Sequence, residues 1–75
     1  MRIYRSVFLE TGKEYENDVA VNLTLDACVT ELDRLQKAHE SEKAYNGDNR
    51  TIARIDSTSL VVAFRGQSWM YLAVD

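Results

Sequence analysis

The chain of 75 residues has no proline, three glycines, one cysteine and one histidine. Its single cysteine, Cys28, cannot form an internal disulfide, which favours a reducing compartment. The start of the chain, Met1 to Arg5, lacks the apolar segment and cleavage site of a signal peptide. No apolar run approaches the roughly 20 residues of a membrane span. We therefore expect a cytoplasmic protein with no membrane contact.

The sequence has few residues of the types that act in catalysis or bind phosphates and metals. His39 is the only histidine, and about 16 Å of helix, at 1.5 Å per residue, would separate it from Cys28, too far for a nucleophile and its base. Gly47 and Gly66 are isolated turn glycines rather than a phosphate-binding loop. The carboxylates lack an accompanying histidine or a tight acidic loop. We expect no enzyme activity, no cofactor and no metal.

The composition is that of one globular domain spanning residues 1–75, with 45% hydrophobic and 28% charged residues. A chain of this length supports only a thin core. The net charge is −3, from 12 acidic and 9 basic residues. This balance argues against direct nucleic-acid binding, which depends on Lys and Arg.

The hydrophobic pattern predicts the element order ββαβββ. The first four elements are strands at 2–9 and about 14–23, a helix over about 25–44 and a strand over about 50–56. A turn at 57–59 leads into two strands on either side of 65–68. This order predicts an α+β domain, an antiparallel sheet of four to five strands with one helix packed on one face.

The ends of the helix have clear signals. Thr24 is suited to cap the first turn, Asp26 complements the helix dipole, and Asn46 or Gly47 can end the helix. One face of the helix carries apolar residues at three-and-four spacing, with one histidine among them, and we expect this stripe to face the core. Its members are Leu25, Cys28, Leu32, Leu35 and His39, with Val29 and Ala38 beside them.

The first hairpin turns near Gly12, and its register remains open. A loop of Thr11 and Gly12 alone would place Glu10 opposite Lys13 and Arg5 opposite Asp18.

The last hairpin decides the predicted site, because the length of its turn sets which side chains share a face. We favour an odd, three-residue loop, which makes one face wholly apolar. That face would contain Leu60, Val62, Phe64, Met70, Leu72 and Val74 and would lie under the helix. The other face would contain Val61, Ala63, Arg65, Trp69, Tyr71 and Ala73. An even loop would instead bring Phe64 beside Trp69.

The uncovered face with the odd loop is the first candidate for binding a partner. It carries Arg65, Trp69 and Tyr71, and Arg54 joins them because Ala53 and Ile55 are better core residues. Arginine and large aromatic side chains dominate binding energy at protein interfaces. The alternative is that Trp69 closes the edge of the core and Tyr71 stands on a solvated sheet.

The acidic second strand is another candidate contact. Glu10, Glu14, Glu16 and Asp18 crowd nine residues and could imitate a row of phosphates or dock on a basic partner. The alternative is a solvated strand whose charges prevent pairing between sheet edges.

The layout resembles that of a known group. It comprises a strand pair, a helix opened by Thr24-Leu-Asp-Ala27, and a meander from Ile52 through Leu60 to Val74. This plan is similar to small phage-encoded inhibitors, in particular anti-CRISPR proteins acting on type I surveillance complexes, and to phage inhibitors of bacterial RNA polymerase. The resemblance implies a non-enzymatic inhibitor that acts in the cytoplasm of the host bacterial cell, binds a host nucleoprotein complex and blocks access to DNA.

Two other classes stay open. The bare sheet face could pair with itself in a homodimeric regulatory or antitoxin-like module. A nucleic-acid binder would use Arg50, Arg54 and Arg65, and its affinity would fall steeply with salt.

Overall fold

The computed structural model describes residues 1–12 and 14–75, and within them one helix and five strands. The elements are β1 (Arg2–Leu9), β2 (Glu14–Ala20), α1 (Leu25–Asn46), β3 (Thr51–Asp56), β4 (Ser59–Phe64) and β5 (Gln67–Val74). The predicted order ββαβββ is confirmed.

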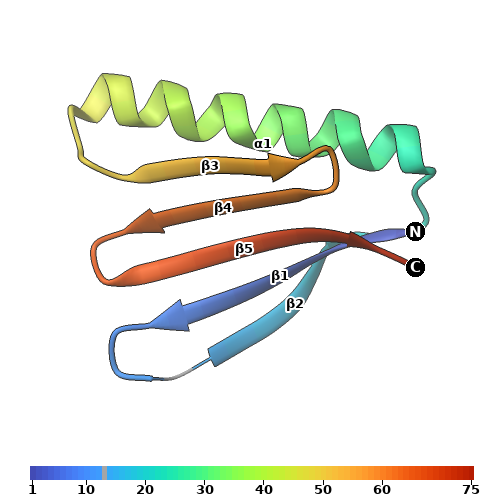
Figure 1. Ribbon diagram of the computed structural model, residues 1–75, viewed down its shortest axis with the longest axis horizontal. Coiled ribbons are helices and arrows are strands. Elements are labelled where there is room, and N and C mark those ends of the chain that lie inside the picture. The colour runs from blue at the N-terminus through green and yellow to red at the C-terminus, as the bar shows by residue number, and fades with distance from the viewer. Residues whose placement is uncertain (13) are drawn as a thin grey trace.

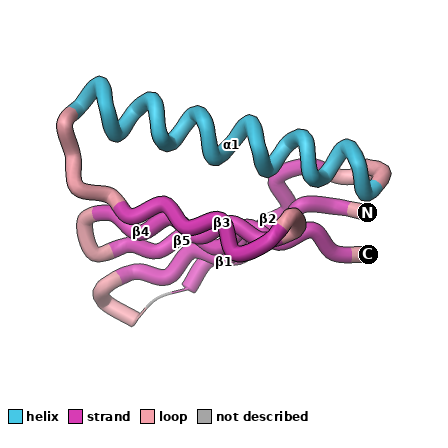
Figure 2. The backbone as a smooth tube through the Cα atoms, turned by 45° about the horizontal axis from the view of Figure 1, so that its top comes forward, coloured by secondary structure: helices cyan, strands magenta, loops and turns pink. Residues whose placement is uncertain are grey.

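All five strands form one antiparallel sheet in the order β2-β1-β5-β4-β3. The first and last strands of the chain are therefore neighbours inside the sheet (Figure 1). Helix α1 lies on one side of the sheet, and no second layer covers the other side in the described chain (Figure 2). This confirms the predicted α+β class with a single helix on one face.

Both predicted ends of α1 are confirmed. The hydroxyl of Thr24 accepts a hydrogen bond from the amide of Ala27 at 3.1 Å, which satisfies one free donor of the first turn. Gly47 ends the helix in the left-handed conformation, with φ of 63°. Among the described residues, no helix has both the length and the apolar character needed to cross a membrane.

The core lies between α1 and the sheet. Its fully buried side chains are Ile3, Cys28, Leu32, Leu60 and Val62. The predicted helical stripe is confirmed at Cys28 and Leu32, and Leu35 packs against the same cluster. Leu25, predicted in that stripe, is half exposed in the first turn of the helix.

The β4–β5 turn contains two residues, Arg65 and Gly66, because Phe64 pairs with Gln67. Their φ angles are 51° and 74°, the combination of positive values that a tight two-residue hairpin requires. The three-residue loop favoured from the sequence is therefore wrong. The turn pairs Val62 with Trp69 and Leu60 with Tyr71.

This register defines two faces of the sheet. The covered face, which meets α1, carries Ile3, Val7, Ile52, Arg54, Leu60, Val62, Phe64, Trp69, Tyr71 and Ala73. The open face carries Tyr4, Ser6, Phe8, Glu14, Glu16, Ala53, Val61, Ala63, Ser68, Met70 and Leu72. Since Met70 and Leu72 were predicted to lie under the helix, the sequence assigned the strand β5 residues to the wrong faces.

The β1–β2 hairpin also differs from the simplest register. Arg5 lies opposite Asn17 and donates to its side-chain oxygen at 3.1 Å, so the alternative with Arg5 opposite Asp18 is not observed. The predicted partner of Glu10, Lys13, lies outside the described residues. Strand β2 ends at Ala20 rather than near Leu23, and Asn22 turns the chain with φ of 59°.

Candidate protein-binding face

The open face is built from three rows of side chains that cross neighbouring strands. The middle row runs Ala53, Val61, Met70, Ser6, Glu16 from β3 to β2. The second row runs Thr51, Ala63, Ser68, Phe8, Glu14, and the third runs Ser59, Leu72, Tyr4, Asp18. Every row changes from small polar or apolar residues to a carboxylate. The face therefore has an apolar centre on β4, β5 and β1 and an acidic side on β2.

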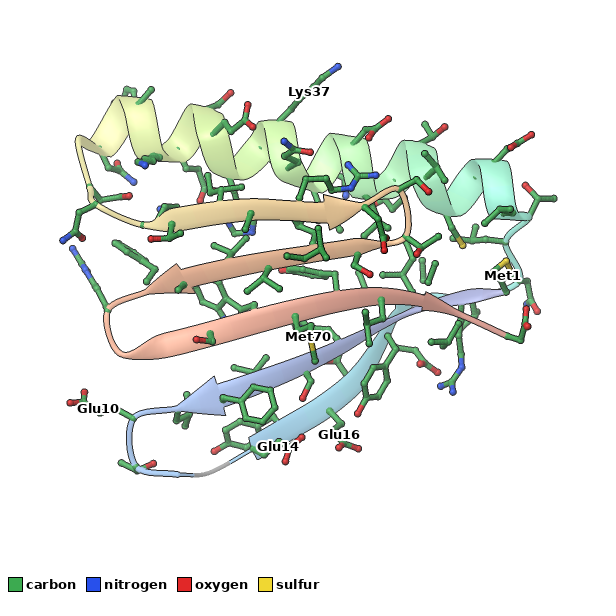
Figure 3. The ribbon with its side chains drawn as sticks, in the orientation of Figure 1. Met1, Glu10, Glu14, Glu16, Lys37 and Met70 are labelled. Carbon is green, nitrogen blue, oxygen red and sulfur yellow. The ribbon has the colours of Figure 1, made fainter. Side chains whose placement is uncertain are left out.

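Side-chain exposure agrees with a surface that is apolar without being buried. Phe8 is 43% exposed, while Val61, Ala63, Met70 and Leu72 are partly exposed. Ile55, next to this face at the end of β3, is 63% exposed, although the sequence predicted it in the core. Figure 3 shows Met70 on β5, with Glu14 and Glu16 on β2 beyond the intervening strand. Contiguous apolar area of this kind is typical of an interaction surface.

The acidic side is organised around Ser6, which is only 2% exposed. Its hydroxyl donates to Glu14 Oε1 at 3.0 Å. Burial, together with the hydrogen bond and negative charge of Glu16, raises the pKa of Tyr4. Tyr4 is therefore a neutral hydroxyl at physiological pH. The predicted acidic contact residues Glu14 and Glu16 thus share the open face with Tyr4 and Phe8.

Asp18 plays a different part from the two glutamates. It accepts a hydrogen bond from Arg2 Nη1 at 2.7 Å, and the Arg2 guanidinium lies 5.9 Å from the centre of the Tyr4 ring. Its charge is therefore matched within the chain. Among the described residues, no lysine or arginine forms an ion pair with Glu14 or Glu16.

Trp69 and Tyr71, predicted as exposed binding residues, lie beneath α1. The rings of Trp69 and His39 stack with centroids 5.7 Å apart, and Tyr71 is 5% exposed within the core cluster. The physical reason is the even turn at Arg65 and Gly66, which puts both aromatic side chains on the face of Leu60 and Val62. The predicted exposed panel of arginine and aromatic residues is wrong.

Arg54 also belongs to the covered face, where each nitrogen of its guanidinium donates at least one hydrogen bond. Nη1 donates to Asp33 Oδ1 at 2.6 Å and to Gln36 Oε1 at 3.0 Å, both on α1. Nε and Nη2 donate to the carbonyls of Asp56 and Ser57 in the β3–β4 turn. Arg54 therefore joins the helix to β3 and to the β3–β4 turn.

Arg65 is exposed, but it lies in the turn beyond both faces. Its guanidinium carbon is 4.9 Å from the centre of the Phe64 ring. The candidate residues thus separate into three places: Trp69, Tyr71 and Arg54 on the covered face, Arg65 in the turn, and Glu14 and Glu16 on the open face with Asp18 at its margin.

A buried arginine cluster went unpredicted. The Arg50 side chain is 4% exposed and donates to Asp48 through Nε and Nη2, to Glu42 Oε2 at 2.9 Å and to His39 Nδ1 at 3.0 Å. Arginine has no acceptor, so His39 Nδ1 must accept this bond. The Phe64 ring centre lies 4.5 Å from the guanidinium carbon of Arg50. The one sequence signal was His39 on the apolar stripe, which placed a polar group needing a partner near the core.

The contacts of these side chains bear on two possible functions, catalysis and nucleic-acid binding. Burial and the charge of Arg50 lower the pKa of His39, and its Nδ1 is taken up by the hydrogen bond from Arg50. Cys28 is fully buried against the sheet.

Arg50 and Arg54 are both paired with carboxylates, so they do not form the basic surface that a nucleic-acid binder needs. Within residues 1–12 and 14–75, no three potential ligand side chains gather to hold a metal ion.

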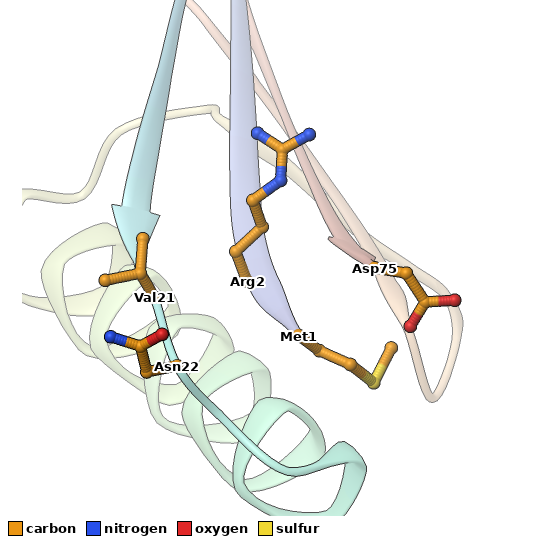
Figure 4. Close-up of a pocket in the computed structure, with 5 residues that line it drawn as sticks. All are labelled: Met1, Arg2, Val21, Asn22 and Asp75. Carbon is orange, nitrogen blue, oxygen red and sulfur yellow. The ribbon is translucent and has the colours of Figure 1, made fainter.

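An open pocket lies where the chain's first and last residues meet. It is lined by Met1, Arg2, Val21, Asn22 and Asp75, with Val21 and Asn22 on one side of Met1 and Asp75 on the other (Figure 4). The Met1 ammonium group donates to the Leu23 carbonyl at 2.7 Å. This bond ties the first residue to the segment before α1, and we assign no ligand to the pocket.

The chain matches no protein-family model, no curated protein and no solved structure.

Proposed function

We propose that the protein is a non-enzymatic inhibitor that binds a host nucleoprotein complex through its open face and blocks access to DNA. The observation that carries the proposal is the apolar centre of that face. There Val61 lies opposite Met70, with Leu72 and Phe8 on the same face of β5 and β1, and no layer of the described chain lies above them. Removing apolar surface from water contributes about 25 cal/mol per Å², from which the cost of association is subtracted.

The nature of the partner is inferred from the layout. The element order resembles that of phage-encoded inhibitors, for which a type I CRISPR surveillance complex is the implied target. An inhibitor of this kind acts by stoichiometric binding, so it needs a stable surface rather than a catalytic group. The contacts of His39 and Cys28 within the fold agree with this requirement, because both side chains support packing.

The test compares two surface variants with the natural chain. Val61→Thr with Met70→Gln makes the centre of the open face polar while keeping the side chains close to their original size. Tyr45→Ala is the matched control, because Tyr45 is 92% exposed on α1, away from the open face. Each chain is immobilised and used to capture complexes from a bacterial lysate, and its fold is checked by circular dichroism.

We expect the natural chain and the Tyr45→Ala variant to retain the same nucleoprotein complex, and the open-face variant to lose at least about 2 kcal/mol of binding. Adding the natural chain to the isolated complex should lower its binding of DNA in proportion to the amount added. Equal capture by the open-face variant, or DNA binding that the added chain leaves unchanged, would contradict the proposal.

A further inference from the structure

The charge of the open face is confined to one side. Glu14 and Glu16 end two of the cross-strand rows on β2, whereas the same rows end on β3 with Thr51 and Ala53. The one cation on this face, among the described residues that the register places there, is Arg2, and it is paired with Asp18. The charge distribution of the open face is therefore asymmetric: the face is apolar in the middle, uncharged at β3 and negative at β2.

This distribution is unsuited to face-to-face pairing with a second copy. A two-fold axis along the strands would set β2 of one copy against β3 of the other, where Glu14 and Glu16 would meet Thr51, Ala53 or Ile55 and find no cation. An axis across the strands would set β2 against an oppositely directed β2, so carboxylates of Glu14, Glu16 and Asp18 would face one another, and Arg2, the cation at one end, is already paired with Asp18. Desolvating a carboxylate without a partner, or opposing two of them, costs several kcal/mol.

A nucleic acid is also a poor match, because phosphates would approach the same two glutamates. A pure imitation of phosphates fits no better, since the carboxylates of the open face lie along β2 alone, where Asp18 is already paired with Arg2, and apolar residues such as Met70 and Phe8 occupy the middle of the face. What the face complements is a surface with both an apolar and a basic part.

We infer that the open face binds a protein whose contact surface has an apolar centre and lysine or arginine side chains on one side, which lie opposite Glu14 and Glu16. The inference rests on the proposed function and adds the chemistry and orientation of the partner. The bond from Ser6 holds the Glu14 carboxylate in place before binding, which lowers the entropic cost of forming the ion pair.

Three synthetic peptides serve as probes. Each is an amphipathic helix with the same leucine and phenylalanine face, and the residues along one side of that face are lysine, glutamine or glutamate. Binding is measured by fluorescence anisotropy at low and at raised salt. We expect the lysine peptide to bind at least about tenfold more tightly than the glutamine peptide, with the glutamate peptide weakest, and the difference to shrink as salt is raised.

The decisive variant is Glu14→Gln with Glu16→Gln, which keeps an oxygen able to accept from Ser6 but removes both charges. It should bind the glutamine peptide as the natural chain does and lose the preference for lysine. Asp26→Asn with Glu40→Gln, on the exposed side of α1, makes the same change in net charge and should keep the preference.

The outcomes separate this inference from the proposal on which it rests. Equal binding of all three peptides by the natural chain overturns the charge inference and leaves a binding open face. Failure to bind any peptide overturns both. The inference is also overturned if the natural chain sediments as a dimer and the Val61→Thr, Met70→Gln variant sediments as a monomer. Tight binding of a DNA duplex by the natural chain overturns it as well.

Discussion

The two faces of this sheet are made by alternate residues of the same strands. The residue types that are common at protein interfaces lie on the covered face, and those that are common in cores lie on the open face. The covered face contains Trp69, Tyr71 and Arg54, the types that most often dominate binding. The open face contains Val61, Met70 and Leu72, which would be ordinary core residues. The comparison teaches that residue type alone does not identify the outer face of a thin two-layer domain.

The helix explains the difference. Its carboxylates and amides meet the arginines of the covered face, as Asp33 and Gln36 do for Arg54, and His39 stacks on Trp69. Polar groups can be buried there because each has a partner, and no buried side-chain polar atom in the described chain lacks one. The open face has few such partners, so uncharged apolar residues fill most of it.

The largest expected effect uses a matched pair of leucines on opposite faces. Leu60→Ala empties a fully buried site under α1 and should lower the free energy of unfolding by about 3 kcal/mol. Leu72→Ala, on the open face, should cost only about 1 kcal/mol because Leu72 is partly exposed. Urea unfolding followed by circular dichroism measures both. Equal losses would show that the two faces are equally buried and would break the comparison.

A smaller effect should follow from changing the turn that assigns residues to the faces. Gly66 has φ of 74°, and a Cβ there would lie 2.6 Å from Glu10 Oε2. Gly66→Ala should therefore lower the free energy of unfolding by about 1 to 2 kcal/mol, from backbone strain and from displacing Glu10. Gly12→Ala is a useful control, since its added Cβ would contact nothing within 4 Å, which separates the steric contribution from the left-handed backbone. Equal losses for both would remove Glu10 from the explanation.

The smallest effect concerns pH and the covered face alone. Burial and the charge of Arg50, opposed by Glu42, lower the pKa of His39 below its value of about 6.5 in an unfolded chain. The unfolded state then binds the proton more readily, so this contribution to stability is present above about pH 6.5 and is lost as pH falls through the lower folded pKa.

His39→Gln keeps an acceptor for Arg50 but cannot take up a proton. Urea unfolding between about pH 7 and about pH 5 should therefore show a steeper loss for the natural chain than for this variant. Fluorescence of Trp69, the single tryptophan, reports the neighbouring ring directly. Identical pH profiles for the two chains would show that the Arg50 cluster does not depend on neutral His39.

Much of the fold could be predicted because its signals are local. Thr24 and Gly47 mark the ends of α1, and the alternation of apolar residues marks the strands. The assignment of faces could not be predicted in the same way, since both sets of alternate residues in the last hairpin are apolar. It depended on a two-residue turn in which Arg65 adopts φ of 51°, a conformation usually reserved for Gly or Asn.

The candidate site was predicted in part. Glu14 and Glu16 were selected from their spacing on one strand, which period-two alternation places on one face. The Arg50 cluster escaped prediction because its partners come from α1 and from the segment after it, at sequence separations of 2, 8 and 11 residues. Only the packed helix brings them together.

The position of β5 has a consequence for how the molecule is made. This strand joins β1 on one side and β4 on the other, and it follows every other described element along the chain. A nascent polypeptide on the ribosome therefore has the β1–β2 hairpin and the α1–β3–β4 unit, but lacks the strand that pairs with both, until Gln67–Val74 has been synthesised. Cleavage before Gln67 should therefore leave the β1–β2 hairpin and the α1–β3–β4 unit without the strand that joins them in the sheet.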